Sequence, residues 1–305
     1  MIFSAGGFKD GQSQTKSTMR KTILSAFLLL AVSAFVYPQH VSFKLTGGLA
    51  WINGNDYNSG IAGENKYIKV TSLTTSGAYK TLESGANLQF EIINYLNPRL
   101  AIGIGGGYYR LANKSKVTSQ GTISDVPYSA ESTYKTRLSV IPLFLNFHYF
   151  LRLAAKMSLD IFAGPVFQIV QFNFENPSKT SIMSIDHTVS FTASKTSLDF
   201  QGGLGLHYEF SSGFALFLEA GYRRGQISNI KGNWADLGNS ASGPISNSSA
   251  EYFMWTYNEA VQGSTYRRIG YFDKNGPAGD SISGARKADL QLSGLTAAAG
   301  LKFSF

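Results

Sequence analysis

The stretch SLDFQGGLGLHYEF, residues 197–210, alternates between large apolar residues and small or polar ones. The apolar set is Leu198, Phe200, Leu204, Leu206, Tyr208 and Phe210, and the opposing set is Asp199, Gln201, Gly203, Gly205, His207 and Glu209. Successive side chains of a β-strand point to opposite faces, so a period of two predicts a strand. One face of this strand is apolar, and the other is small and polar.

The same alternation recurs along the chain. Seven further segments carry it: residues 41–51, 82–95, 99–111, 134–150, 157–172, 214–227 and 292–305. All eight segments reach the length of about 9–11 residues that a tilted strand needs to cross a bilayer. Pro142 has no N–H to give to a strand ladder, so it predicts a bulge inside its segment.

The connections between these segments indicate the topology. Three are short and polar or contain glycine: Asn97-Pro98, residues 152–156, and Ser211-Ser212-Gly213. Four are long: residues 53–81, 112–133, 173–196 and 228–291. Short and long connections alternate strictly, as periplasmic turns and outer loops do in outer-membrane barrels. We therefore predict an all-β fold, a closed antiparallel eight-stranded transmembrane β-barrel with both termini in the periplasm. Ten strands are the alternative, if a hairpin from residues 228–291 inserts.

The polar faces of the segments carry charges among glycine and alanine, which argues against a soluble β-sandwich with a wet polar face. The charged residues are Lys44, Glu91, Asp160, Asp199, Glu219, Arg223 and Lys302. Small residues mixed with opposite charges suit the narrow interior of a small barrel. Because buried charges need partners, we predict a salt-bridge network of these residues that plugs the lumen. A gated ion path is the alternative. His148 and His207 also fall on the interior side.

Aromatic residues gather near the segment ends, as in the two interfacial girdles of a membrane barrel. They are Phe43, Trp51, Tyr95, Tyr108, Tyr149, Phe150, Tyr208, Phe210, Phe214, Tyr222 and Phe305. The chain ends in the alternating run LKFSF, with Phe303 and Phe305 on one face. This ending is similar to the signal by which the barrel-insertion machinery recognises its substrates.

A leader precedes the first segment. Residues 19–39 combine a cationic start, Met19-Arg20-Lys21, with an apolar run of signal-peptide length, and we place cleavage between Ala34 and His40. Residues 1–18 are interpreted as a mis-assigned start or a disordered tail, and residues 40–305 as the barrel domain. An uncleaved N-terminal anchor is the alternative.

Composition excludes several classes of protein. The chain has no cysteine, which excludes disulfides, thiolate metal sites, a cysteine nucleophile and a lipoprotein anchor. The first 39 residues carry four cations and one anion, which leaves +5 of the net charge of +8 for the remainder. Without a run of Lys or Arg, this mild excess does not indicate nucleic-acid binding.

The sequence offers little catalytic chemistry. Asp186-His187 is the one candidate for an acid–base pair at an outer rim, and a solvated loop histidine is the simpler interpretation. Four histidines without a spaced acidic cluster predict no metal site. The glycines of residues 103–107 and 202–205 lack the features of a phosphate loop and suit lumen packing instead. We predict no catalytic residues, no cofactor and no enzymatic activity.

The last long connection is rich in aromatic residues and arginine, the composition of binding hot spots. A binding surface is predicted from Tyr252, Trp255, Tyr257, Tyr266, Arg267, Arg268 and Tyr271. The alternative is a hairpin above the membrane that packs on itself.

Three segments carry a family resemblance. They are residues 138–145 (LSVIPLFL), residues 199–206 (DFQGGLGL), and residues 217–225 (FLEAGYRRG) with residues 227–230 (ISNI). The chain resembles the PorT-like family of Bacteroidetes outer-membrane β-barrels over most of residues 40–305. The resemblance implies a location in the cell outer membrane and, for some members, a link to protein export. The connection formed by residues 228–291 is longer than expected for this family, so the resemblance implies no function for this loop.

Taken with the pattern, the resemblance predicts a plugged outer-membrane barrel with a structural or loop-mediated surface-binding role. A narrow porin-like channel and an accessory role in protein export are the alternatives. The expected partners are outer-membrane lipid and lipopolysaccharide, the barrel-insertion machinery, and an extracellular ligand at the last long loop, with no nucleic acid.

Overall fold

A computed structural model describes residues 40–305, apart from 73, 124–125, 182–184 and 241–242. The predicted leader lies outside the described residues. Among the described residues, no helix is both long enough and apolar enough to cross a membrane.

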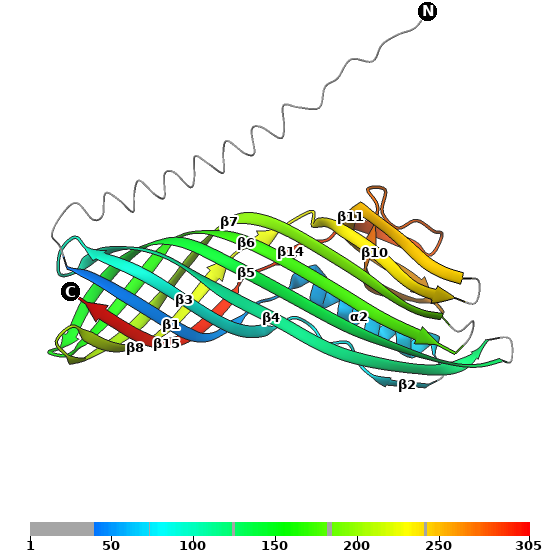
Figure 1. The fold of residues 1–305 in the computed structure, drawn as a ribbon, viewed down its shortest axis with the longest axis horizontal. Coiled ribbons are helices and arrows are strands. Elements are labelled where there is room, and N and C mark those ends of the chain that lie inside the picture. Colours follow the sequence, from blue (N-terminus) through cyan, green and yellow to red (C-terminus); the bar gives the residue numbers. More distant parts are fainter. Residues whose placement is uncertain (1–39, 73, 124–125, 182–184, 241–242) are drawn as a thin grey trace, which may run out of the picture.

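Eight antiparallel strands pair in a ring (Figure 1). They are β1 (Val41–Trp51), β3 (Ser84–Tyr95), β4 (Leu100–Ile123), β5 (Val126–Ala154), β6 (Met157–Thr180), β7 (Ile185–Ser211), β8 (Phe214–Arg224) and β15 (Gly294–Ser304). Each strand pairs with its neighbour along the chain, β15 pairs with both β8 and β1, and β7 pairs with β8. Each alternating segment of the sequence lies mainly on one of these strands, although the end of segment 214–227 forms β9 (Gln226–Ile227) outside the ring. The three short connections are tight turns at one end of the ring.

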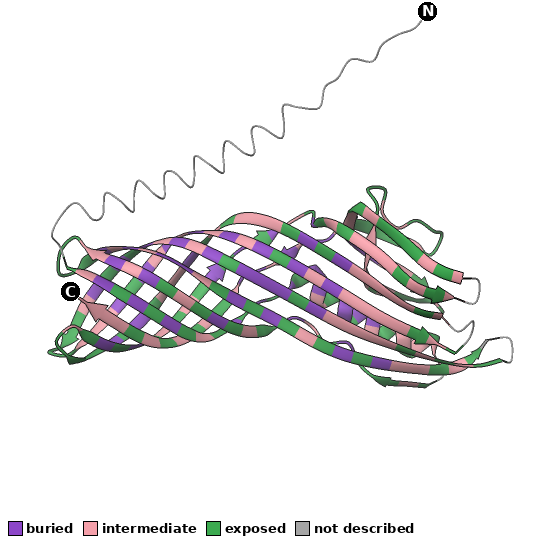
Figure 2. Cartoon of the chain, viewed as in Figure 1, coloured by how far each residue is buried: buried purple, intermediate pink, exposed green. Residues whose placement is uncertain are grey.

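Burial in the ring follows the predicted period of two (Figure 2). In β1, Ser42, Lys44 and Thr46 are buried, whereas Phe43 and Leu45 are exposed. β8 repeats the pattern, with Leu218 65% exposed beside the buried Phe217. Large apolar side chains therefore cover the outside of the ring, and the charged ones lie inside.

Strands β4 to β7 continue far beyond the ring, which corrects the prediction that residues 112–133 and 173–196 are loops. The β4–β5 ladder is paired out to Ile123 and Val126, and the β6–β7 ladder out to Thr180 and Ile185. These extensions are polar on both faces over long stretches, so the one-sided apolar pattern fades there. Backbone pairing with a neighbouring strand extends them nevertheless.

The outer part of the molecule consists of these extensions together with shorter elements (Figure 1). These are α2 (Asn55–Thr71), β2 (Thr74–Gly77), β9 (Gln226–Ile227), β10 (Lys231–Ser240), β11 (Gly243–Val261), β12 (Ser264–Phe272), β13 (Ile282–Lys287) and β14 (Leu290–Gln291). β10 pairs with the outer end of β7, over Asp186–Ala193, while β8 pairs with its inner end. Residues 228–291 therefore extend the sheet outside the ring.

Helix α2 lies within the curve of the outer strands, where the sequence predicted only a long loop. Asp56 in its first turn and Lys69 in its last suit the helix dipole. Its buried face includes Tyr57 and Ile61, which join a core of apolar residues from the surrounding strands. That core includes Leu111, Leu138, Phe172, Phe191 and Met254. Two glycines and several polar residues weaken the helical signal in the sequence, so the helix depends on this packing.

The expected bulge at Pro142 does not form. The β4–β5 register is the same on both sides, with Leu143 opposite Gly106 and Val140 opposite Tyr109. Only the pairs of Ile141 and Pro142 with β4 are missing from the ladder. The missing N–H of proline is therefore accommodated by a local break in pairing, without an inserted residue.

Candidate functional site

A buried ionic network crosses the interior of the ring. It is formed by side chains from five strands: Lys44 on β1, Glu91 on β3, Asn146 and His148 on β5, Asp160 on β6, and Glu219 on β8. We call these six residues the central network. All are buried or nearly so, because the inward face of each strand meets the others across a narrow lumen.

Lys44 joins two carboxylates of the central network. Its Nζ donates to Glu219 and lies 3.4 Å from Glu91 Oε2. Glu91 is also the direct cross-strand partner of Lys44 in the β1–β3 register. The ammonium group lies 5.0 Å from the ring centre of Phe217 and 5.2 Å from that of Phe162. The cation is therefore enclosed by two carboxylates and two aromatic rings.

His148 bridges Glu91 to the third carboxylate of the central network, Asp160. Its Nδ1 lies 3.0 Å from Asp160 Oδ1, and its Nε2 lies 2.9 Å from Glu91 Oε1. Asn146 Nδ2 donates to the same Glu91 oxygen at 2.8 Å. A Cβ atom at Gly103 would lie 2.2 Å from Glu91 Oε1, so glycine at this position makes room for the bridge. The central network thus runs without interruption from β8 to β6.

Three of the seven predicted interior charges lie outside the central network. Arg223 donates to Gln201 Oε1 at 3.2 Å and lies over the ring of Tyr109. Asp199 is only partly buried and accepts from Ser197 Oγ at 2.7 Å. Lys302 Nζ donates to the hydroxyl of Tyr95 at 3.1 Å. Among the described residues, neither Arg223 nor Lys302 pairs with a carboxylate, so the structure brings Lys44, Glu91, Asp160 and Glu219 together and leaves these three apart.

The amides Asn146 and Gln201 were missed by sequence reasoning. Gln201 Nε2 donates to Asn146 Oδ1 at 3.1 Å and links the central network to Arg223. Both residues have the inward parity of their strands, but an uncharged amide gives no signal that distinguishes it from other polar lumen residues. Tyr95 and Phe150, expected in the girdles, also lie on the inner side, where their rings pack 5.2 Å apart.

The central network leaves little free space. A cavity of about 20 Å³ remains between Lys44, Glu91, Asn146, Glu219 and Arg223. A volume of this size holds about one water molecule. Among the described residues, no group of three or more His, Asp or Glu side chains is arranged to hold a metal ion.

The seven residues of the predicted loop surface lie on β11 and β12. Most of their side chains pack against neighbouring aromatic rings or against helix α2. Trp255 and Tyr257 are buried, and Tyr271 stacks on Phe191 at 4.4 Å. Tyr252 stacks on Trp234 at 4.8 Å, and Tyr266 packs edge-on against Tyr67 at 6.2 Å. Arg267 is exposed, whereas the other six residues are buried or partly buried.

Two arginines of β12 fasten helix α2. Arg267 pairs with the fully buried Asp56, which also accepts from Arg286 at 2.7 Å and from the Asp289 amide at 2.9 Å. About two turns further along the helix, Arg268 donates two hydrogen bonds to Glu64, of 2.7 and 3.0 Å. Their main role in the structure is therefore to hold the helix.

The Asp186-His187 pair does not form as an acid–base unit. His187 Nδ1 lies 2.8 Å from Asp236 on β10, and Asp186 pairs with Lys179 at 2.7 Å. Neighbouring residues in a strand point to opposite faces, which keeps the two side chains apart.

Tyr79 provides a test of the packing in the outer part. Its ring stacks on Tyr134 at 3.6 Å, and burial raises the pKa of its phenol from 10.0 to about 12. Because the folded-state pKa is the higher one, the stabilisation is complete below pH 10 and is lost as the pH rises through 12. We expect the free energy of unfolding of the outer part to fall by roughly 2 kcal/mol over this interval. Hydrogen exchange measured as a function of pH reports this free energy. In a Tyr79→Phe variant it should fall less over the same interval. An equal fall in both proteins would contradict the assignment.

Solved outer-membrane proteins resemble the chain. No protein family profile matches the sequence, and neither does any curated protein. A major outer membrane protein from Thermus thermophilus is 12% identical, with a TM-score of 0.31 over 87% of this chain and 99% of that one. OprG from Pseudomonas aeruginosa is 10% identical, with a TM-score of 0.33 over 88% and 97%. The outer membrane protease OmpT from Escherichia coli is 8% identical, with a TM-score of 0.29 over 88% and 97%. At these sequence identities and TM-scores, the similarity says nothing about the activity of this chain.

Proposed function

We propose that this chain is an integral outer-membrane β-barrel, in which the eight strands of the ring span the bilayer and the central network closes the lumen. The outer part then stands above the membrane and gives the protein a structural or surface-binding role. The three tight turns lie on the periplasmic side in this orientation.

The observation that carries the proposal is the distribution of side chains in the ring. Large apolar residues are exposed on its outside, among them Leu45, Phe90, Leu204, Leu218 and Leu295, whereas Lys44, Glu91 and Asp160 are buried inside. A soluble protein does not expose so many large apolar residues on adjacent strands. In hydrocarbon this arrangement is favourable, and a closed ring leaves no strand edge exposed to lipid.

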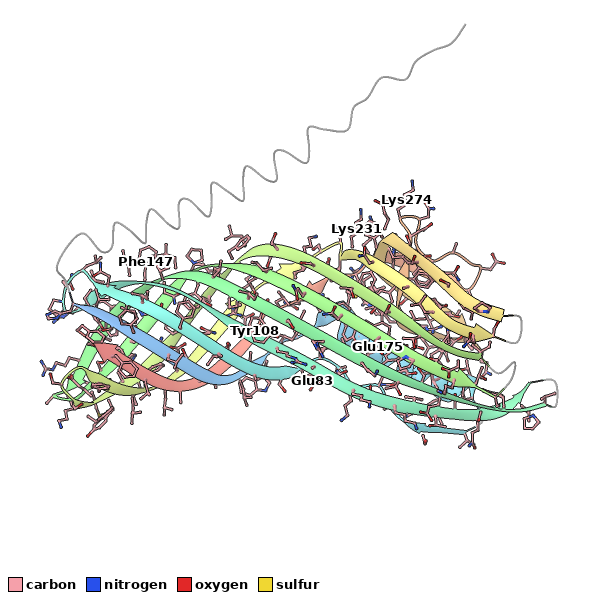
Figure 3. The ribbon with its side chains drawn as sticks, in the orientation of Figure 1. Glu83, Tyr108, Phe147, Glu175, Lys231 and Lys274 are labelled. Carbon is pink, nitrogen blue, oxygen red and sulfur yellow. The ribbon has the colours of Figure 1, made fainter. Side chains whose placement is uncertain are left out.

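The outer part has a different surface. Figure 3 shows Phe147 and Tyr108 on the ring, whereas the charged residues Glu175, Lys231 and Lys274 lie along the outer part. Surface ion pairs such as Lys135 with Glu175 and Lys231 with Glu251 occur there. This change from apolar to charged surface supports a boundary between membrane and water near the outer end of β1.

The closed lumen predicts that the refolded protein carries no steady current in a planar lipid bilayer. The free space of about 20 Å³ at the central network is too small for a hydrated ion. Single-channel recording of the full chain tests this, with vesicle insertion checked by the heat-dependent gel shift of folded barrels. A steady open level in the inserted protein would contradict closure and support the narrow channel instead.

A surface-binding role is testable at the stacked pair of Trp234 and Tyr252, which is partly exposed on β10 and β11. The full chain in nanodiscs should retain a ligand from spent culture medium that a Trp234→Ser, Tyr252→Ser double variant does not retain. Equal retention by both proteins would leave the structural role as the better proposal.

A further inference from the structure

A second cavity opens at the turn end of the ring. Its volume is about 590 Å³, within the range of about 300–1,000 Å³ that is typical of ligand pockets. The turns after β3, β5 and β7 form its rim, and Phe150, His207 and Lys302 lie deeper, toward the central network. We call this cavity the turn-end vestibule.

The vestibule is strongly cationic. Four cations line it, Arg99, Arg152, Lys156 and Lys302, against the single acid Glu209. Among the described residues, none of the four cations pairs with a carboxylate. Arg152 donates only to the carbonyl groups of its own turn, at 3.3 and 3.5 Å. A concave site lined by one sign of charge concentrates ligands of the opposite sign.

His207 gives a second and independent indication of a ligand. The residue is only 2% exposed, and its ring stacks on Phe217 at 5.2 Å. Its Nδ1 has no hydrogen-bond partner among the described residues, and Nε2 lies 3.5 Å from Asp160 Oδ2 without forming a hydrogen bond. Buried polar atoms are normally paired, and His207 lines the vestibule, so its unpaired Nδ1 suggests a partner that enters from this cavity.

Lys302 has hydrogen-bonding capacity to spare beside this histidine. Its ammonium group has three donors, and the hydroxyl of Tyr95 accepts one of them. The group also lies 5.3 Å from the ring centre of Phe150. An aromatic ring and a hydroxyl neutralise no charge, so an anion would find an uncompensated cation at this position.

We propose that the turn-end vestibule binds the carboxylate of an apolar peptide C-terminus, held by Lys302 and His207. The apolar part of the ligand packs on Tyr95 and Phe150, which line the same cavity and lie on the inner side of the ring. A lipid headgroup is less suitable, because lipid contacts the outside of the ring and the vestibule lies within it. The site goes beyond the proposed function. In the orientation proposed above, the vestibule opens toward the periplasm, and the peptide would enter from that side.

Calorimetric titration of the full chain in detergent micelles tests the ligand chemistry. The probes are N-acetyl-Ala-Ala-Phe with a free carboxylate, the same peptide with a C-terminal amide, and inorganic phosphate. We expect the acid to bind about tenfold or more tightly than the amide, since a hydrogen bond to a charged group is lost. Phosphate should not compete. Equal binding of acid and amide, no binding at all, or displacement by phosphate would each overturn the proposal, the last in favour of a small-anion site.

Variants locate the site. Lys302→Gln and His207→Phe should each weaken binding of the free acid about tenfold, and Lys116→Gln in the outer part is the matched control. Folding of each variant is checked by its heat-dependent gel shift, because His207 is buried and its replacement can disturb the ring. A folded Lys302→Gln protein that binds like the parent would overturn the assignment. Binding in micelles does not depend on conductance, so this proposal and closure of the lumen can fail separately.

Discussion

Replacing Lys44 with methionine is expected to lower the free energy of unfolding by about 3–5 kcal/mol. Lys44 is 4% exposed, and its ammonium group pairs with Glu91 and Glu219. Glu91 keeps His148 and Asn146 after the replacement. Glu219 has no other ion-pair partner among the described residues, so the variant leaves an uncompensated carboxylate in the lumen. Urea unfolding in lipid vesicles, followed by tryptophan fluorescence, measures the loss.

The matched control for this experiment is Lys116→Met. Lys116 lies 2.7 Å from Glu131, but both side chains are about half exposed, so its loss should change stability by less than about 1 kcal/mol. Adding Glu219→Gln to Lys44→Met should recover part of the lost stability, because it removes the stranded charge. If the two lysine variants were equally stable, the central network would not hold the ring together.

The ring could be predicted from sequence because each of its strands follows a local rule. In residues 197–210 the burial of most side chains follows from parity, since the outside of the ring lies on one side and a narrow lumen on the other. The same parity placed Lys44, Glu91, Asp160 and Glu219 inside. It could not say which of them meet, because the partner of a lumen residue depends on strand stagger and on side-chain reach across the ring.

The structure of the outer part could not be predicted from the sequence, because it depends on packing between residues that are far apart in the chain. Residues 112–123 and 185–196 lie beyond the ring, and buried residues such as Val117 and Phe191 pack into the core of the outer part through contacts that the local sequence does not reveal. The same cause hid α2, whose buried residues, such as Tyr57 and Ile61, are interspersed with glycine and polar residues. Arg267 and Arg268 were assigned to a binding surface because arginine beside aromatic residues has the same composition in a hot spot and in a helix anchor.

Helix α2 depends on an unusually close approach to β12, which is possible only because Gly63 has no side chain. A Cβ atom at this position would lie 1.7 Å from the backbone carbonyl oxygen of Arg267, and one at Gly60 would lie 2.6 Å from Ile269 Cβ. A backbone carbonyl cannot rotate away as a flexible side chain can. Any larger residue at Gly63 must therefore push the helix off the strand and stretch the bonds from Arg267 to Asp56 and from Arg268 to Glu64.

We expect Gly63→Val to destabilise the docked outer part by about 3 kcal/mol, at the upper end of the effect of overpacking. The ring should keep its urea midpoint, because the backbone that Gly63 approaches belongs to β12, which lies outside the ring. Hydrogen exchange of the α2 amides should rise sharply, and Ser59→Ala, at an exposed position of the same helix, should leave it unchanged. Protected α2 amides in Gly63→Val would mean that the helix is held by its ion pairs alone. Loss of the ring together with the helix would mean that the outer part and the ring fold as one unit, in which case the closed lumen and the docked helix must form together.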